Sequence, residues 1–298
     1  MDRFESMTAF VAAVEAGGFS AAARRTRMPL ATISRKVSDL ETMLGVRLLN
    51  RSVGGVSLTE SGQSYYPECR RLLDALAEAE RAASGEYRAP RGDLTITAPI
   101  AFGRMHLTPI VVAFLRAYSD VGISLRLTDE ILHLGDDQID LAVRISRLPD
   151  SSMVATRIGD IRPVICASPA YLADRGTPQH PEDLADHECL SGTRLSVPEA
   201  WPFQIGKTIR RFPIHGRLAV TTSEAAIEAA IAGAGLIRVL CYQVVEAQRQ
   251  GYLVTVLRGF EPEPTPISLV HASARLVPLK LRAFLDYAVP RLKQRLAV

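Results

Sequence analysis

The sequence predicts an α/β protein in three parts: an all-helical N-terminal head, one long connecting helix, and a C-terminal two-lobed α/β domain. Three observations predict this arrangement. Apolar residues recur at helical spacing in the head, which ends in a glycine-centred hairpin signal. A helical pattern then continues to about residue 84, and from residue 92 onward strand and helix patterns alternate. We therefore expect boundaries at 1–58, 59–91 and 92–298.

The head begins with two short predicted helices. An apolar face from Phe4 to Val14 predicts the first helix. Gly17-Gly18 ends this helix, because glycine adopts the left-handed conformation at little cost. Ser20 is expected to cap a second helix through Ala21–Ala23, since its hydroxyl can accept a hydrogen bond from the first turn.

A third helix and a hairpin complete the predicted head. The helix starts at the Met28-Pro29 turn and is closed by Gly45. Its buried stripe is expected to be Ile33, Val37, Leu40 and Leu44. Two strands, Val46–Leu49 and Val56–Leu58, are expected around Gly54-Gly55.

This order of elements is that of a winged helix-turn-helix, which places its third helix in the major groove of DNA. Every Lys and Arg of residues 1–58 except Arg3 lies between Arg24 and Arg51, where the only acids are Asp39 and Glu41. Cations bind phosphates, and arginine pairs bidentately with guanine. We therefore expect Ser34 and Arg35 to read bases. The full DNA-binding set is expected to be Ser20, Arg24, Arg27, Leu30, Thr32, Ser34, Arg35, Lys36 and Arg51. The alternative is a small helical domain with a solvated basic face.

Thr59 is the expected N-cap of the long connecting helix, which would span roughly 35–40 Å at about 1.5 Å per residue. One apolar stripe on a protruding helix indicates self-association as a homodimer or homotetramer. The alternative is a helix packed on its own C-terminal domain. Gly85–Gly92 is expected to be a hinge. The stripe consists of Tyr65, Cys69, Leu72, Leu73, Leu76 and Ala79.

Four runs in the N-terminal part carry a family resemblance: Phe10–Ala23, Thr32–Glu41, Leu44–Arg51 and Leu58–Gly62. In these runs the chain resembles the LysR-type transcriptional regulators, in register and without gaps. One position departs from the pattern. Many members carry Ser-Gln or Ser-Pro where this chain has Pro29-Leu30, and a leucine cannot make the polar base contact of a glutamine.

The C-terminal part resembles the effector-binding domain of the same family, which is similar to two-lobed periplasmic binding proteins. The resemblance implies a first lobe of about 92–165 and 265–298 and a second lobe of about 166–264. The runs that carry it are Gly92–Ile96, Ala98–Arg104, Asp140–Ile145, Pro149–Ser152, Cys166–Leu172 and Gly176–Pro178.

Alternation of strands and helices in this part predicts parallel sheets. The strands are expected at Leu94–Thr97, Ile123–Leu127, Leu141–Ile145, Val164–Ala167, Leu218–Thr221 and Leu253–Leu257. The helices are expected at Leu107–Tyr118, after Ser168-Pro169, from Ser223, and at Leu279–Leu296.

Ligands of such sheets bind beyond strand C-termini and near helix N-termini. The first turn after residue 97 is apolar, whereas Arg144 and the helix start at Ser223 could hold an anion. We therefore expect a small aromatic or acidic effector, with a structural salt bridge as the alternative role of Arg144. The candidate effector-binding residues are Pro99, Ile100, Ala101, Phe102, Arg144, Ser146, Thr221, Thr222, Ser223 and Arg238.

Composition and motifs narrow the function further. The net charge of the whole chain is only +3, so the chain is not a general polyanion binder. Its basic character is instead concentrated in the head. Four separated cysteines indicate reduced, buried thiols, with a redox sensor as the alternative. The sequence carries neither a signal peptide nor an apolar run of membrane-spanning length, so a cytoplasmic protein is expected. The six scattered histidines form no metal motif, and no catalytic or cofactor motif is present, so no metal, no cofactor and no enzymatic activity are expected.

The sequence therefore predicts a ligand-responsive DNA-binding transcriptional regulator. Its expected partners are double-stranded DNA, a small effector, further copies of itself and RNA polymerase, with no membrane. Two alternatives remain: an enzyme or small-molecule-processing domain fused to a DNA-binding head, and an architectural protein whose C-terminal domain serves only assembly.

Overall fold

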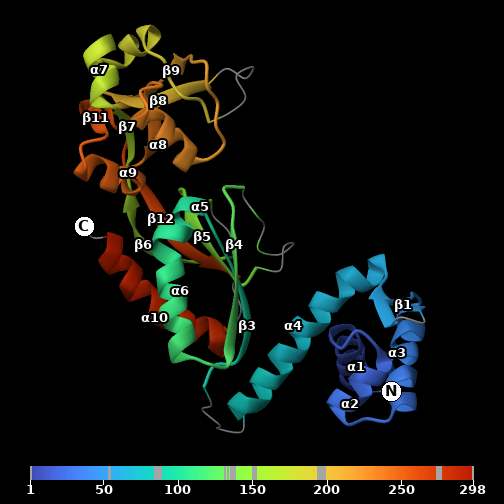
Figure 1. Ribbon diagram of the computed structural model, residues 1–298. Helices are drawn as coiled ribbons and strands as arrows, with labels where there is room; N and C mark the ends of the chain where they lie inside the picture. The colour runs from blue at the N-terminus through green and yellow to red at the C-terminus, as the bar shows by residue number, and fades with distance from the viewer. Residues whose placement is uncertain are drawn as a thin grey trace. The chain divides into compact units, whose positions relative to one another are not determined.

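The computed structural model describes residues 2–52, 55–83, 89–130, 132, 134, 139–149, 153–192, 199–272 and 277–296. Its contacts divide the chain into two units (Figure 1). The first unit comprises Met1–Gly92 with Leu276–Arg282, and the second comprises Asp93–Arg275 with Ala283–Val298. Gly54 of the predicted hairpin, Gly85 of the predicted hinge and Asp150–Ser152 of the run that carries the resemblance lie outside the described residues.

The first unit contains the predicted three helices, hairpin and long helix. Its elements are α1 (Arg3–Glu15), α2 (Phe19–Thr26), α3 (Leu30–Leu44), β1 (Leu49–Ser52), β2 (Gly55–Leu58) and α4 (Glu60–Ala83). Two predicted termini are confirmed. Gly45 closes α3 with a φ of 70°, and the Thr59 hydroxyl accepts a 3.0 Å hydrogen bond from the N–H of Gly62 at the start of α4.

Two predictions in the head are wrong by a few residues. Gly18, not Ser20, is the N-cap of α2, because Phe19 packs on the core and the helix already begins there. The first wing strand begins at Leu49 and not at Val46. The backbone N–H groups of Leu48 and Leu49 both donate to a carboxylate oxygen of Glu41, at 2.8 and 3.0 Å. These hydrogen bonds hold the chain against α3 up to Leu49, so strand pairing with β2 begins only at that residue.

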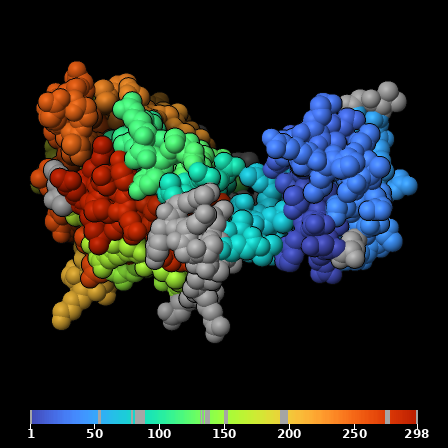
Figure 2. Space-filling model, turned by 90° about the horizontal axis from the view of Figure 1, so that it is seen from below, coloured from blue at the N-terminus to red at the C-terminus, as the bar shows by residue number. Residues whose placement is uncertain are grey.

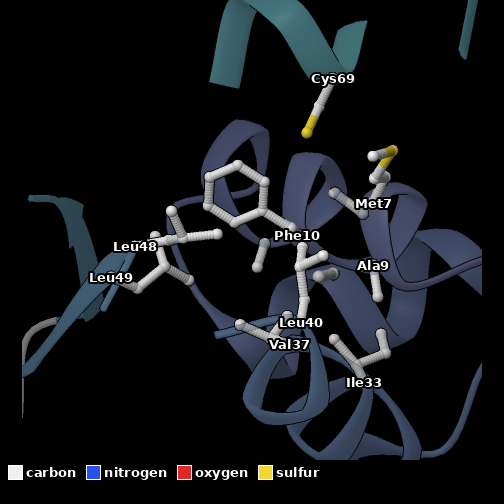
Figure 3. Packing of buried hydrophobic residues seen from close by; sticks show 12 residues of the cluster. Met7, Ala9, Phe10, Ile33, Val37, Leu40, Leu48, Leu49 and Cys69 are labelled. Carbon is white, nitrogen blue, oxygen red and sulfur yellow. The ribbon is translucent and has the colours of Figure 1, made fainter. Parts of the chain in front are cut away.

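The core of the head is formed by α1, α3, the start of the wing and α4 (Figure 3). Phe10 and Leu40 have no exposed surface, and neither does Cys69, which α4 contributes from above. The N-terminal part of the predicted apolar stripe on α4 thus packs on its own head. Leu72 of the same stripe is 41% exposed.

The second unit contains two sheets, which we call lobe I and lobe II. The lobe I sheet has the strand order β4-β3-β5-β12-β6. Its strands are β3 (Gly92–Ala98), β4 (Val121–Leu127), β5 (Leu141–Ile145), β6 (Val154–Ile161) and β12 (Thr265–His271). Its helical segments are α5 (Ile100–Phe102), the π-helical turn Gly103–Leu107, α6 (Thr108–Ala117) and α10 (Leu279–Leu296).

Lobe II is built on a sheet of order β10-β7-β11 and a separate hairpin β8-β9. Its strands are β7 (Pro163–Ala167), β8 (Glu199–Ile205), β9 (Thr208–Ile214), β10 (Ile237–Leu240) and β11 (Val254–Val256). Its helices are α7 (Pro169–Arg175), α8 (Ser223–Ile231) and α9 (Cys241–Arg249), with 3₁₀ turns at Pro181–Asp186 and Arg258–Phe260.

The prediction of parallel sheets is only partly correct. β3 and β5 pair in parallel, but β12 runs antiparallel to both β5 and β6, and β7 runs antiparallel to both of its neighbours. β12 is the segment that returns from lobe II, and it enters the lobe I sheet from the opposite direction. The expected strand Leu218–Thr221 is absent, and that segment forms one isolated bridge between Ser191 and Ala219.

α6 and α10 lie side by side on lobe I, as Figures 1 and 2 show. The rings of Phe114 and Phe284 meet edge to face with centroids 5.1 Å apart. Among the described residues, the helical run Ile100–Ala117 is long and apolar enough by composition to cross a membrane, and 39% of it is buried. The bent pair of α1 and α2 also passes this test. Core helices of soluble proteins pass it too, so it is weak evidence for a membrane span.

Candidate nucleic-acid interface and effector site

The position of α3 follows from its buried stripe. Ile33, Val37 and Leu40 have no exposed surface and face α1. The other side of the helix and its first turn face outward, and Leu30 is 48% exposed. No side chain caps this turn. The N–H groups of Thr32 and Ile33 donate to the Pro29 carbonyl, and those of Leu30 and Ala31 come before the hydrogen-bond ladder of the helix begins.

Three predicted DNA-binding arginines are exposed on α2 and α3. Arg24 lies at the end of α2, Arg27 is its C-cap, and Arg35 lies on α3. Within the described residues, none of the three forms an ion pair. The positive charge of such guanidinium groups is not compensated by a protein carboxylate, so it is available to bind the phosphates of DNA.

Two other predicted DNA-binding cations already bind protein groups. The Lys36 ammonium pairs with the carboxylate of Glu5 on α1, and the Lys36 side chain is only 17% exposed. Arg51 donates to the Ser38 hydroxyl at 2.8 Å, and its guanidinium lies 5.0 Å from the ring centroid of Phe19. In this structure the two side chains hold elements of the head together. Arg51 remains 46% exposed and can still reach DNA.

The hydroxyl residues of the predicted interface lie on both helices of the motif. Ser20 is exposed on the first turn of α2, and Thr32 and Ser34 are half-buried on α3. Sequence reasoning missed the part played by Glu41. Its carboxylate accepts the two wing N–H groups and lies 3.4 Å from Arg51, so it fixes the wing to α3. No pattern in the sequence distinguishes this acid from a solvated one.

The predicted apolar wall of the effector site forms the start of α5. Pro99 is the N-cap, Ala101 and Phe102 are buried, and Ile100 is half-buried. The N–H of Ile100 donates to a carboxylate oxygen of Asp129 at 3.1 Å. This N–H group already donates to a negatively charged carboxylate. The charge of Asp129 would repel a second anion at this turn.

The polar effector candidates bind different neighbours. Arg144 of β5 donates to the backbone carbonyl of Leu132, and burial lowers the pKa of its guanidinium. Ser146 directly follows β5 and is exposed. Among the described residues Arg144 forms no salt bridge, which was the expected alternative, and its partner is instead the backbone carbonyl of Leu132.

A second group of candidates lies at the start of α8. Thr221 is exposed, and the Thr222 hydroxyl caps the helix by accepting from the N–H of Ala225. The Ser223 hydroxyl accepts a 3.0 Å hydrogen bond from the Gln243 amide, which joins α8 to α9. Arg238 is exposed on β10.

The structure also brings lobe I and lobe II together at an aromatic junction. The ring of Tyr242 on α9 contacts Phe102 and His106 of lobe I, with centroids 5.9 and 5.1 Å apart. His106 Nε2 and the Tyr242 hydroxyl are buried, and neither has a hydrogen-bond partner among the described residues. Burial lowers the pKa of His106, with a contribution from Arg295, and raises the pKa of Tyr242.

An ion pair spans the same junction. The guanidinium of Arg104, in the π-helical turn, lies 3.4 Å from the carboxylate of Glu224 on α8. Sequence reasoning noted Phe102 but missed His106, Arg104 and Glu224, because residues that are more than a hundred positions apart carry no local signal. Asp129 did carry one, since it follows the predicted strand Ile123–Leu127 at its C-terminal end.

Within the part of the chain that the structure describes, no group of three or more His, Cys, Asp or Glu residues could hold a metal ion. All four cysteines are free. Burial raises the pKa of Cys69 and of Cys166 to about 11, and that of Cys189 to about 12. These three thiols therefore stay protonated and unreactive at neutral pH.

A helix-turn-helix head followed by a two-lobed α/β domain defines the class of ligand-responsive transcriptional regulators. Residues 4–63 match the family described as bacterial regulatory helix-turn-helix protein, lysR family. Residues 88–293 match the LysR substrate binding domain. The chain belongs to the LysR family of transcriptional regulators.

Known relatives agree with this assignment over almost the whole chain. An HTH-type transcriptional regulator of Xanthomonas campestris is 35% identical and covers 95% of this chain and 83% of its own length. The structure of CrgA, a LysR-type regulator from Neisseria meningitidis, superposes with a TM-score of 0.61 at 31% identity, covering 97% of this chain and 98% of CrgA.

The full-length virulence activator AphB of Vibrio cholerae superposes with a TM-score of 0.60 at 28% identity, over 96% of this chain and 98% of AphB. These relatives are regulators, and the chain is a DNA-binding regulator with an effector-binding domain, not an enzyme.

Proposed function

We propose that this regulator binds its operator as a dimer or tetramer, with α3 of each head in the major groove. We further propose that it switches transcription when a small aromatic or acidic effector binds between lobe I and lobe II. The observation that carries the DNA-binding mode is the exposed first turn of α3, together with the exposed Arg24, Arg27 and Arg35 of the same motif, which form no ion pair within the described residues. We also propose that the protein acts in the cytoplasm, where chromosomal operators lie, and that RNA polymerase is a further partner.

The dimer is proposed on the basis of α4. A groove of about 500 Å³ lies where α4 meets the end of α3, lined in part by Leu44, Val46 and Tyr65. Leu72 on α4 is exposed as well. A palindromic operator requires two heads related by a two-fold axis, and paired α4 helices would supply that symmetry.

Arg35→Ala tests the DNA-binding mode. The full-length variant should bind an operator fragment at least several-fold more weakly in a gel-shift assay at fixed salt, because a base or phosphate contact is lost. Arg249→Ala is the matched control, since Arg249 pairs with Glu246 on lobe II and its loss removes the same charge. Equal affinity of the Arg35 variant and the wild type would contradict the proposal.

The effector proposal supposes that ligand binding shifts the two lobes between conformations and so alters the relation of the paired heads and the bend of the DNA. Small aromatic acids should raise the melting temperature of the effector-binding domain. Arg144→Ala should reduce the response of operator binding to the effector more than it reduces operator binding itself. A parallel loss of both would show that Arg144 only anchors the segment around Leu132.

A further inference from the structure

We propose that Leu30 reads a thymine in each operator half-site by packing its side chain against the thymine methyl group. This inference rests on the proposed entry of α3 into the major groove and adds the identity of one base. It begins from the unusual exposure of a large apolar side chain at the tip of the DNA-binding helix.

Leu30 is the first residue of α3, and its side chain is 48% exposed. Its neighbours Pro29 and Ala31 are exposed too, so the tip of the helix is apolar. Leu30 is three residues before Ile33, the first buried residue of α3, so it lies at the end of the helix beyond the core of the head. Among the described residues of the head, none buries its side chain.

The surroundings of this apolar tip identify its partner. Arg24 in the last turn of α2, Arg27 at its C-cap and Arg35 on α3 are exposed and have no ion-pair partner within the described residues. Three unpaired guanidinium groups favour a polyanion and disfavour an apolar protein surface, whose contact would desolvate them. An exposed apolar side chain on the same motif as these cations therefore fits duplex DNA, whose phosphates flank the groove.

The chemistry of leucine then selects the base. Leucine has neither a hydrogen-bond donor nor an acceptor, so it cannot read the polar pattern of a base edge. In the major groove thymine alone among the four bases presents a methyl group. Cytosine and adenine present amino groups at their edges, which would lose water against leucine without gaining a partner. Ser34 lies one helical turn further along and is placed to read a neighbouring base.

The test removes single methyl groups from the DNA. A preferred duplex is first selected from a random pool by the full-length protein, and each thymine is then replaced in turn by deoxyuridine, which lacks only the methyl group. In each half-site, replacement of the one contacted thymine should weaken wild-type binding about fourfold, as expected for the loss of one buried methyl-sized group. All other single replacements should leave the affinity unchanged. Leu30→Ala should bind the thymine and uracil duplexes with equal affinity.

Two further variants make the test specific. Met43→Ala changes a side chain of similar exposure, 39%, at the far end of α3, about 20 Å along the helix, and should keep the wild-type sensitivity to uracil. Leu30→Gln should shift the preferred base from thymine to adenine, because glutamine pairs bidentately with adenine.

The outcomes separate this inference from the proposed function. If the wild type binds its selected duplex but no thymine is sensitive to uracil, or if Leu30→Ala keeps the sensitivity, the thymine contact is refuted while the DNA-binding mode stands. If the wild type enriches no sequence at all and Arg35→Ala binds as well as the wild type, the entry of α3 into the groove is itself refuted.

Discussion

At the scale of single residues, Arg27 combines a backbone role with a proposed DNA contact. Its φ of 55° is left-handed, which among the described residues other than glycine is shared only with Leu257. A side chain in this conformation is strained, and glycine is the residue that ends helices there most readily. Charge and backbone can therefore be tested separately at this position.

We predict that Arg27→Gly keeps or raises the melting temperature of the head but weakens operator binding. The slope of binding against salt concentration should fall by about one, because one phosphate contact is lost. Arg27→Val removes the same charge but forces a β-branched residue into the left-handed region, so its melting temperature should fall. A salt slope identical to that of the wild type would show that Arg27 does not touch phosphate.

His106 makes the second prediction, which concerns pH. The groups that face it are Phe102, Tyr242 and, from α10, the positive charge of Arg295. Its pKa is lower in the folded protein than the ordinary value near 6.5. Just below pH 6.5, His106 is protonated in the unfolded chain but stays neutral in the folded protein. Stability is therefore complete above about pH 6.5 and falls with decreasing pH.

The melting temperature of the effector-binding domain should accordingly fall between pH 7.5 and 5.5, and His106→Phe should reduce this fall. Burial also lowers the pKa of His187, so part of the pH dependence should remain in the single variant and disappear in the double variant with His187→Phe. If the single variant melts with the wild-type pH dependence, His106 is not among the groups that cause it.

At the scale of elements, the wing depends on one carboxylate. Glu41 on α3 accepts the N–H groups of Leu48 and Leu49, and its side chain is only 13% exposed. We predict that Glu41→Ala lowers the stability of the head by about 1–3 kcal/mol, because two backbone donors lose their partner. Operator binding should weaken as the wing loosens.

Glu41→Gln is the matched variant, since its amide oxygen can still accept both hydrogen bonds. It should recover most of the stability while losing the charge that faces Arg51. Thermal unfolding of both full-length variants gives the comparison. Equal loss in the two variants would mean that the charge, and not the acceptor, holds the wing.

The helices of the head were predictable because each is delimited by local chemistry. Gly45 ends α3 and Thr59 starts α4 through their own backbone or side chain. The start of β1 was not predictable, because a side chain on another element determines it. The same holds for the lobe junction, where Tyr242 meets Phe102 and His106 across more than a hundred residues. Strand direction in the sheets likewise depends on where the returning chain enters.

At the scale of the whole molecule, each of the two units has a hydrophobic core of its own. Leu40 is completely buried in the core of the head. Tyr242 is 7% exposed at the junction of the two lobes. Units with separate cores are expected to unfold in separate steps, and distant substitutions to act independently.

Calorimetry of the full-length protein should therefore show two transitions that respond to different substitutions. Leu40→Ala should lower only the transition of the head, by about 2–5 kcal/mol of stability. Tyr242→Ala should lower only the transition of the effector-binding domain, because the ring that joins the lobes is lost. Tyr242→Phe should leave that transition unchanged or raise it, since it removes a buried hydroxyl that has no hydrogen-bond partner among the described residues.

This independence constrains how a bound effector can change transcription. If the cores do not share stability, an effector should raise the melting temperature of the effector-binding domain and leave that of the head unchanged, while still altering operator affinity. The signal would then travel through the arrangement of paired heads and not through their folding. An effector that raises both melting temperatures equally would contradict this, and would show that effector binding stabilises the head itself.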